Sequence, residues 1–297
     1  LYHLNLNIKF NNHDINKGHY IMAFNFHQAE KGIVLANSHR GYSSCRPENT
    51  FPAFEAARLA GTHCIEIDIH LTADNQLVVT HDHRVDRVST GQGFVEQLTY
   101  PQLLEFDFGM KYHPDFAGTR IPLLADVLRW AVKNGMGLIV EAKQRRRHDE
   151  FVAAMVAMLR ELPEAISHIQ MLGFNHALIN RVKAHIPELA LQVVTLERYN
   201  NQLAVVQQSN ASCVCFEYEF AHIDDLRAYK KAGLGVRMYL HEVKNGLDPL
   251  TQYQYKFGYD SRPEILSWLR EGLIDMLSHD DIPYLQALIE EAGLRWD

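Results

Sequence analysis

The chain has 297 residues, of which 47% are hydrophobic and 22% charged. This composition is typical of a globular protein and excludes the disordered and collagen-like classes. Acidic residues outnumber basic ones by 36 to 29, for a formal net charge of -7 at pH 7. Such a charge argues against a surface that attracts nucleic acid or anionic lipid as a whole, so we expect no nucleic-acid partner. An anionic substrate would have to be met by local positive groups.

Residues 1–31 differ from the rest, because Asn, His and Lys alternate there with single hydrophobic residues. They contain no signal-peptide core, and no run in the chain is long and apolar enough to cross a bilayer. We therefore expect a poorly ordered N-terminal extension over 1–31 and a cytoplasmic protein without stable membrane insertion. The four cysteines show no C-x-x-C spacing and fit a reducing compartment, without a disulfide framework or structural zinc: Cys45, Cys64, Cys213 and Cys215.

From residue 32 onward, short β-rich apolar runs alternate with longer segments of helical period. The predicted strands are 33–37, 64–69, 77–81, 137–141, 169–172, 191–195, 213–216, 235–239 and 274–277. Helices are predicted between most of them, over 50–60, 123–134, 149–162, 176–185, 223–232 and 263–271. Sustained alternation indicates parallel strands joined by crossover helices. About eight such units in roughly 250 residues predict one TIM-type (β/α)8 barrel over 32–297.

Residues 82–121 interrupt this alternation. Gly91, Gly93, Pro114 and Gly118 break the pattern into a long excursion rather than another strand and helix. We expect a small inserted region after the third strand, and excursions of this length are often functional.

Three acidic residues lie on predicted strands. Glu66 and Asp68 share one face of their strand, opposite three isoleucines. On an antiparallel sheet that face would simply be wet, whereas in a barrel the two carboxylates point inward and repel each other unless a cation joins them. Glu141 ends another apolar strand, where a salt bridge to Lys143 would also explain it. Together the three acids offer oxygen ligands that suit Mg²⁺ or Ca²⁺ better than zinc.

Two of the 17 histidines, His39 and His81, stand at the ends of predicted strands. A single histidine is more often a surface or core residue than a catalyst. At the carboxyl ends of barrel strands, however, two imidazoles beside a cation can form an acid and base pair. Arg40 offers a forked donor suited to phosphate oxygens, and Lys143 would face an anionic substrate.

A series of short motifs carries these residues in a fixed order between positions 33 and 143: His39-Arg40-Gly41, Pro47-Glu48-Asn49-Thr50, Glu66-x-Asp68, Leu71-Thr72-x-Asp74, Val78-Val79-x-His81-Asp82, Asp107-x-Gly109, Ile121-Pro122-x-Leu124 and Glu141-x-Lys143. The series resembles the glycerophosphodiester phosphodiesterase family, and it is specific because many separate elements agree. The second half matches less well. Where the family usually has Trp-Thr-Val-Asn, the chain reads Tyr239-Leu240-His241-Glu242, which bears on the substrate and leaves the catalytic set intact.

The resemblance implies a β/α barrel that uses a divalent metal to hydrolyse glycerophosphodiesters to sn-glycerol 3-phosphate and an alcohol. Carried over residue by residue, it implies acid and base catalysis by His39 and His81, phosphate contacts from Arg40 and Lys143, metal ligation by Glu66, Asp68 and Glu141, a loop braced by Glu48, and a first helix capped by Asn49. The inserted region would overhang the site.

Two alternatives assign a different function to the same residues. A lysophospholipase D or sphingomyelinase D-like enzyme would use the same residues on a lipid and needs an apolar landing surface near the strand ends. A catalytically dead barrel that binds a phosphorylated metabolite is disfavoured, because both histidines and all three acids are present. The sequence leaves open the alcohol, the choice of Mg²⁺ or Ca²⁺, the oligomeric state, and whether water or the glycerol 2-hydroxyl attacks first. We prefer His39 as the base.

Overall fold

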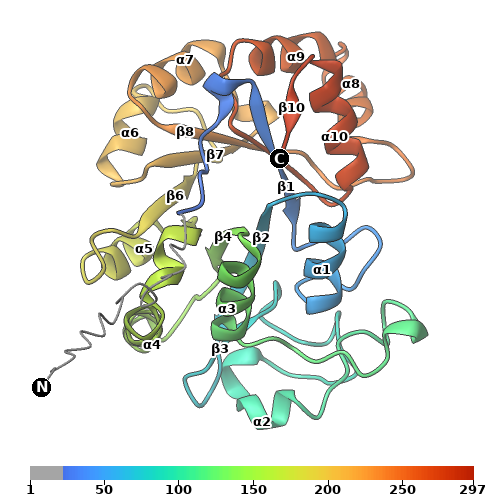
Figure 1. Cartoon of the computed structure of the whole chain (residues 1–297), viewed down its shortest axis with the longest axis vertical. Coiled ribbons are helices and arrows are strands. Elements are labelled where there is room, and N and C mark those ends of the chain that lie inside the picture. The colour runs from blue at the N-terminus through green and yellow to red at the C-terminus, as the bar shows by residue number, and fades with distance from the viewer. Residues whose placement is uncertain (1–22) are drawn as a thin grey trace, which may run out of the picture.

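The computed structural model describes residues 23–297, and in that range eight parallel strands close into a barrel (Figure 1). Each strand pairs with the next around the ring, and the last pairs with the first. The predicted TIM-type barrel is therefore confirmed. Its strands are β1 (Ile33–His39), β2 (Cys64–Leu71), β4 (Gly137–Ala142), β5 (Ile169–Gly173), β6 (Ala190–Val194), β7 (Cys213–Glu217), β8 (Gly235–Tyr239) and β9 (Met276–His279).

Helices surround the barrel (Figure 1). The six predicted helices are found within two residues of their expected ends, as α1 (Phe51–Leu59), α3 (Leu124–Asn134), α4 (His148–Glu161), α5 (His176–Lys183), α7 (Ile223–Lys231) and α9 (Arg262–Arg270). Three helices outside the inserted region and a short C-terminal strand that pairs with β1 were not predicted: α6 (Gln202–Gln208), α8 (Pro249–Phe257), α10 (Ile282–Glu291) and β10 (Arg295–Trp296). Within residues 23–297, no helix has the length and apolar character that a membrane span requires.

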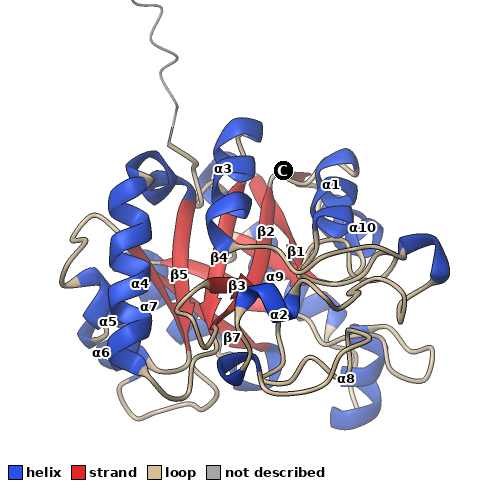
Figure 2. Ribbon diagram, turned by 90° about the horizontal axis from the view of Figure 1, so that it is seen from below, coloured by secondary structure: helices blue, strands red, loops and turns tan. Residues whose placement is uncertain are grey.

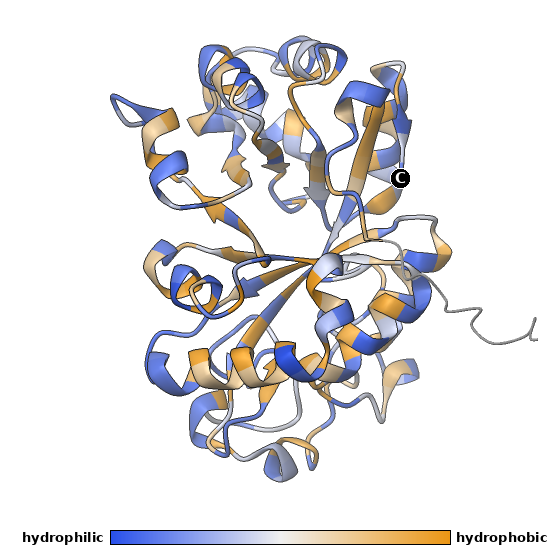
Figure 3. Cartoon of the chain, turned by 60° about the vertical axis from the view of Figure 1, so that its left-hand side comes forward, coloured by the Kyte–Doolittle hydropathy of each residue, from blue (hydrophilic) through white to orange (hydrophobic). Residues whose placement is uncertain are grey.

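Side chains on β2 alternate as its sequence predicts. Ile65, Ile67 and Ile69 are fully buried in the apolar cluster that joins strands to helices, while Glu66 and Asp68 point into the barrel. Full burial of each isoleucine contributes about 1.5–3 kcal/mol. Figure 3 shows the matching pattern, with hydrophobic strands inside and helices that combine hydrophobic and hydrophilic stretches. The packing therefore fixes which face of β2 turns inward.

The predicted strand 77–81 is shorter than expected and lies outside the barrel ring. Strand β3 (Leu77–Val79) pairs antiparallel with β2, because the chain turns back at Asn75, which has a φ of +61°. Asp74 and Asn75 are residues that favour turns, and this signal was not used in the prediction. The inserted region follows the third strand in chain order, as expected, but that strand is not part of the barrel.

The inserted region has its own small apolar cluster. Its backbone forms the short helix α2 (Tyr100–Leu103) and two 3-10 turns at Val95–Gln97 and Pro114–Phe116 (Figure 2). The side chains that pack together here are Val78, Val85, Val95, Leu103, Phe108 and Ile121. This cluster holds the excursion as a compact unit beside β3.

Part of the predicted N-terminal extension packs against the barrel, while residues 1–22 lie outside the described residues. Phe26 is only 7% exposed, and a 3-10 turn follows at Ala29–Lys31. The ring of Phe24 lies directly over Gly137 and the ring of His27 over Gly235, the first residues of β4 and β8. A Cβ atom at either glycine would clash with these rings at about 2 Å. The expectation of poor order therefore does not apply to residues 23–31, which cover the amino end of the barrel.

Candidate active site

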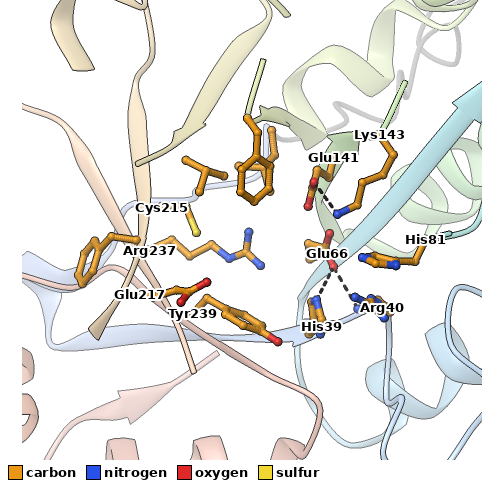
Figure 4. A pocket seen from close by; sticks show the side chains of 14 residues that line it. His39, Arg40, Glu66, His81, Glu141, Lys143, Cys215, Glu217, Arg237 and Tyr239 are labelled. Atoms are coloured by element: carbon orange, nitrogen blue, oxygen red, sulfur yellow. Dashed lines mark hydrogen bonds and ion pairs between the residues drawn. The ribbon is translucent and has the colours of Figure 1, made fainter. Parts of the chain in front are cut away.

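The predicted site residues converge on a single pocket at the carboxyl ends of the barrel strands (Figure 4). The cavity has a volume of about 170 Å³. Six of the eight predicted residues line it, and the other two, Glu48 and Asp68, each pair with Arg40. The complete lining is His39, Arg40, Glu66, His81, Glu141, Lys143, Leu172, Phe174, Val194, Cys215, Phe216, Glu217, Arg237 and Tyr239.

The three predicted metal ligands form one cluster. Carboxylate oxygens of Glu66, Asp68 and Glu141 lie within 4.8 Å of one another, and strand register places Asp68 beside Glu141. All three side chains are buried. Glu66 Oε1 and Asp68 Oδ1 have no hydrogen-bond partner among residues 23–297. Buried oxygens without partners are costly, and three carboxylates are the donor set that a hard divalent cation prefers, so the residues fit such an ion.

Burial and the neighbouring charges shift the pKa values of these carboxyl groups in opposite directions. Burial, followed by the charge of Asp68, raises the pKa of Glu66 well above its usual range and also raises the pKa of Glu141. Burial acts in the same sense on Asp68, but Lys143 and Arg40 outweigh it and hold the pKa of Asp68 well below its usual range. Lys143 Nζ lies 2.7 Å from Glu141 and 3.4 Å from Asp68. The cluster therefore needs positive charge from its surroundings.

His39 is held in place by a carboxylate. Its Nδ1 lies 2.7 Å from Asp280 Oδ1, which also accepts a hydrogen bond from Ser43. The other ring nitrogen, Nε2, lies 3.7 Å from Glu66 Oε2. Burial is the largest influence on the ring and lowers the pKa of His39, which favours the neutral imidazole. Despite its own burial, Asp280 has a pKa lowered to about 2 by the bond from His39.

His81 has a similar partner, which the inserted region supplies. Its Nδ1 lies 2.7 Å from Asp82 Oδ1, and Arg87 Nε donates to the other oxygen of Asp82 at 2.6 Å. Arg87 also donates two hydrogen bonds to Glu48, which in turn accepts one from Arg40. Glu48 thus links the loop after β1 to the inserted region.

The loop after β1 adopts a backbone that few residues allow. Arg40, Gly41 and Asn49 all have positive φ, and a Cβ atom on Gly41 would lie 2.8 Å from Ala53. Asn49 does not cap α1 as expected. Its side chain instead donates to Asp68 Oδ2 at 2.9 Å and accepts from the Asp68 backbone N–H. This change of role keeps Asp68 in position, and Thr50 becomes the residue before the helix.

Sequence reasoning missed several residues of the pocket, all from the second half of the chain. Asp280, the partner of His39, is not among the residues that the sequence singled out. Tyr239, whose ring centre lies 4.9 Å from that of His39, entered only as part of the run Tyr239–Glu242 that departs from the family pattern. Arg237 carried a usable signal, because a charge in the apolar run Val236–Met238 needs a reason to be buried.

Known proteins supply a further comparison. A model of the family described as "Glycerophosphoryl diester phosphodiesterase family" matches residues 39–282 of the chain. The chain belongs to this family. The protein named "Putative glycerophosphodiester phosphodiesterase YhdW" from Bacillus subtilis is 36% identical over 158 residues. A glycerophosphodiester phosphodiesterase from Caldanaerobacter subterraneus is 46% identical over 97 residues. These alignments cover 53% and 33% of this chain, and 64% and 39% of the relatives' own lengths.

Solved structures of other family members share the fold. A glycerophosphoryl diester phosphodiesterase described as putative, from Silicibacter pomeroyi, superimposes with a TM-score of 0.73 and 20% identity, over 91% of this chain and all of that one. A phosphodiesterase from Oleispira antarctica, solved with the product sn-glycerol-3-phosphate, gives a TM-score of 0.72 and 22% identity. That match covers 88% of this chain and 99% of the other. At these identities the likeness establishes the barrel alone.

Proposed function

We propose that the protein hydrolyses glycerophosphodiesters to sn-glycerol 3-phosphate and an alcohol. One observation carries the proposal: two histidines, each paired with an aspartate, line a single pocket together with Glu66 and Glu141 of a cluster of three buried carboxylates. Membership of the glycerophosphoryl diester phosphodiesterase family supports it. So does the product complex of the Oleispira antarctica phosphodiesterase, in which sn-glycerol-3-phosphate is bound.

Glu66, Asp68 and Glu141 would hold a divalent ion, Mg²⁺ or Ca²⁺. When bound, the ion supplies positive charge where a phosphodiester gains negative charge in the transition state. Arg40 and Lys143 line the same pocket and would contact the phosphate oxygens. Both already pair with the acidic cluster, Arg40 Nε at 3.3 Å from Asp68 and Lys143 at 2.7 Å from Glu141, so they are held at the rim before substrate arrives.

The two histidines would exchange protons with the substrate through Nε2. In each ring Nδ1 is occupied by an aspartate, which leaves Nε2 for the pocket. We assign His39 as the base, because burial favours its neutral form. His81 would then protonate the leaving alkoxide, and its side chain is 29% exposed against 12% for His39.

The test is an assay of glycerophosphocholine, glycerophosphoethanolamine and glycerophosphoglycerol with Mg²⁺, with Ca²⁺ and with EDTA. We expect release of sn-glycerol 3-phosphate that depends on a divalent ion and is lost in H39A and H81A. Hydrolysis in isotopically labelled water, with trapping of any cyclic product, separates direct attack by water from attack by the glycerol 2-hydroxyl. Turnover of none of the three diesters with either ion would contradict the proposal.

A second candidate is a lysophospholipase D-like activity on a lipid. Exposed apolar side chains follow three of the strands β5 to β8: Phe174 after β5, Leu196 after β6, and Val243 and Leu247 after β8. Such a rim would suit a lipid tail. Parallel assays of lysophosphatidylcholine and glycerophosphocholine decide between the two, since only the lipid-directed enzyme would prefer the first.

A further inference from the structure

Arg237 is a buried cation at the floor of the pocket. It stands on β8 inside the barrel and is 2% exposed. Its guanidinium donates to Gln192 at 3.2 Å and to Ser278 at 2.8 Å, while its Nε has no partner among residues 23–297. No carboxylate in that range lies within 4.0 Å of its nitrogens. Buried arginines are normally paired with an acid, because an isolated buried charge is costly.

Neutral groups fix the position of this guanidinium. Gln192 on β6 also donates to Gln170 on β5, and Ser278 on β9 donates to Asn37 on β1. These side chains form a polar layer across the inside of the barrel. They satisfy hydrogen bonds of Arg237 but do not neutralise its charge, so that charge acts on whatever lies above the layer.

The acidic cluster lies across the pocket from the Arg237 guanidinium. Figure 4 shows the Arg237 guanidinium extending across the pocket toward Glu66, and Glu141 lines the same cavity. Arg40 and Lys143 pair directly with the cluster, whereas Arg237 faces it across the pocket without a direct contact among residues 23–297.

We propose that Arg237 is a built-in counter-cation for Glu66, Asp68 and Glu141, which stabilises the three carboxylates without metal and weakens their hold on a divalent ion. The proposal rests on the metal site of the proposed function. A fixed positive charge attracts the carboxylates but repels a dication placed among them, so its effects on the metal-free and metal-bound states have opposite signs. Arg237 would therefore make the site stable when empty and its ion exchangeable.

The experiment measures ion binding directly, apart from catalysis. Mg²⁺ and Ca²⁺ are titrated into the metal-free full chain by calorimetry at pH 8, and thermal unfolding is recorded with EDTA and with each ion. In Arg237→Met we expect at least about tenfold tighter binding, a lower Tm in EDTA and a larger rise in Tm on addition of the ion. A merely structural role would weaken binding, because a distorted site holds an ion less well.

Two variants separate charge from packing. Arg237→Lys keeps the charge and should bind both ions as the wild type does. Gln192→Leu removes one hydrogen-bond partner of Arg237 and no charge, so it should lower the Tm and leave the affinity unchanged. Arg237→Gln repeats the charge removal with a polar side chain, in case the methionine variant does not fold.

Binding equal to or weaker than wild type in folded Arg237→Met and Arg237→Gln would overturn the role of Arg237 alone. Binding of neither ion by the wild type would overturn the metal site together with this role. The two failures are therefore distinguishable, and hydrolysis of glycerophosphocholine by the same sample tests the proposed activity separately.

Discussion

The two walls of the pocket differ in kind. Strands β1, β2 and β4 supply charged side chains that are tied to one another by ion pairs and hydrogen bonds, including both predicted phosphate contacts. Strands β5 to β8 supply mainly apolar and aromatic groups, such as Phe174, Phe216 and Tyr239. Replacing one residue of an ion-pair network leaves its partner without a counter-charge, whereas an apolar wall tolerates single substitutions. The first wall therefore suits the chemistry and the second suits the choice of substrate.

The largest effect is expected when a histidine of the charged wall is replaced and the result is compared with loss of a histidine near the apolar wall. His39→Ala or His81→Ala should reduce kcat roughly 10²- to 10⁴-fold with unchanged folding, because each group would transfer a proton in the transition state. The matched control is His241→Ala, which removes an imidazole bonded to Glu217 beyond the opposite wall and should alter kcat only a few-fold. Steady-state kinetics and circular dichroism measure both quantities. Equal losses in all three variants would abolish the distinction between the walls.

A carboxylate exchange gives the next largest effect. Glu66→Gln removes one charge from the buried cluster and should weaken the apparent affinity for the divalent ion roughly 100-fold, since breaking a buried charge pair costs about 3 kcal/mol. Glu217→Gln makes the same change on the other wall and should leave ion dependence unaltered. Activity is followed while EDTA-buffered Mg²⁺ is varied. An unchanged Mg²⁺ curve for Glu66→Gln would contradict its role as a ligand.

Asp280→Asn tests how far the charged wall depends on orientation. The amide retains the size of the side chain but no longer binds His39 as a carboxylate does, so we expect a loss of about 10- to 100-fold in kcat/KM. Asp82→Asn should act similarly through His81. A loss in kcat/KM without any change in Tm identifies orientation as the cause. Wild-type kinetics in both variants would show that the aspartates are dispensable.

Asp280 also makes the free energy of unfolding depend on pH in the acidic range. Asp280 has a pKa lowered from 3.8 to about 2, so its stabilising effect is complete above pH 3.8 and is lost as the pH falls from there toward 2. The full difference amounts to about 2 kcal/mol. Urea unfolding of wild type and Asp280→Asn at several pH values in this window should show a shallower fall for the variant. Parallel curves would mean that the carboxylate gains nothing from its partners in the fold.

The smallest effect is expected on the apolar wall. The Phe174 ring centre lies 5.7 Å from Lys143 Nζ, and a cation–π contact of this kind contributes about 0.5–1 kcal/mol. Phe174→Leu should therefore change KM about two- to five-fold and leave kcat near wild type. Product release at saturating and limiting substrate distinguishes the two constants. A large fall in kcat would mean that this wall also takes part in the chemistry.

The charged wall was largely predictable from sequence, and the reason is local. Glu66 and Asp68 alternate with isoleucines along one strand, so the sequence alone predicts that their side chains share a face. Glu141 and Lys143 are likewise two residues apart on one strand. His81 was expected at the end of a barrel strand, whereas it follows β3, which forms a hairpin with β2 outside the barrel. The turn at Asn75 brings the chain back to the end of the barrel where the pocket lies.

Contacts between distant parts of the chain escaped prediction. Asp280 meets His39 only because β9 closes the ring against β1, and 241 residues separate the two. Arg237 could be recognised as unusual, but the neutral layer that holds it draws on four other strands. Residues 23–31 look polar and irregular, and the glycines that they cover lie more than a hundred residues away.

That short covering segment also sets where the folding unit starts. The family match begins at residue 39, yet the rings seated on Gly137 and Gly235 come from upstream of it. Without them, the glycine-lined entrance to the barrel would open to water, and two strands would lose the side chains that shield their starts. A version that begins at Gly32 keeps β1 but lacks residues 23–31, and it should accordingly be less soluble than a version that begins at Ala23.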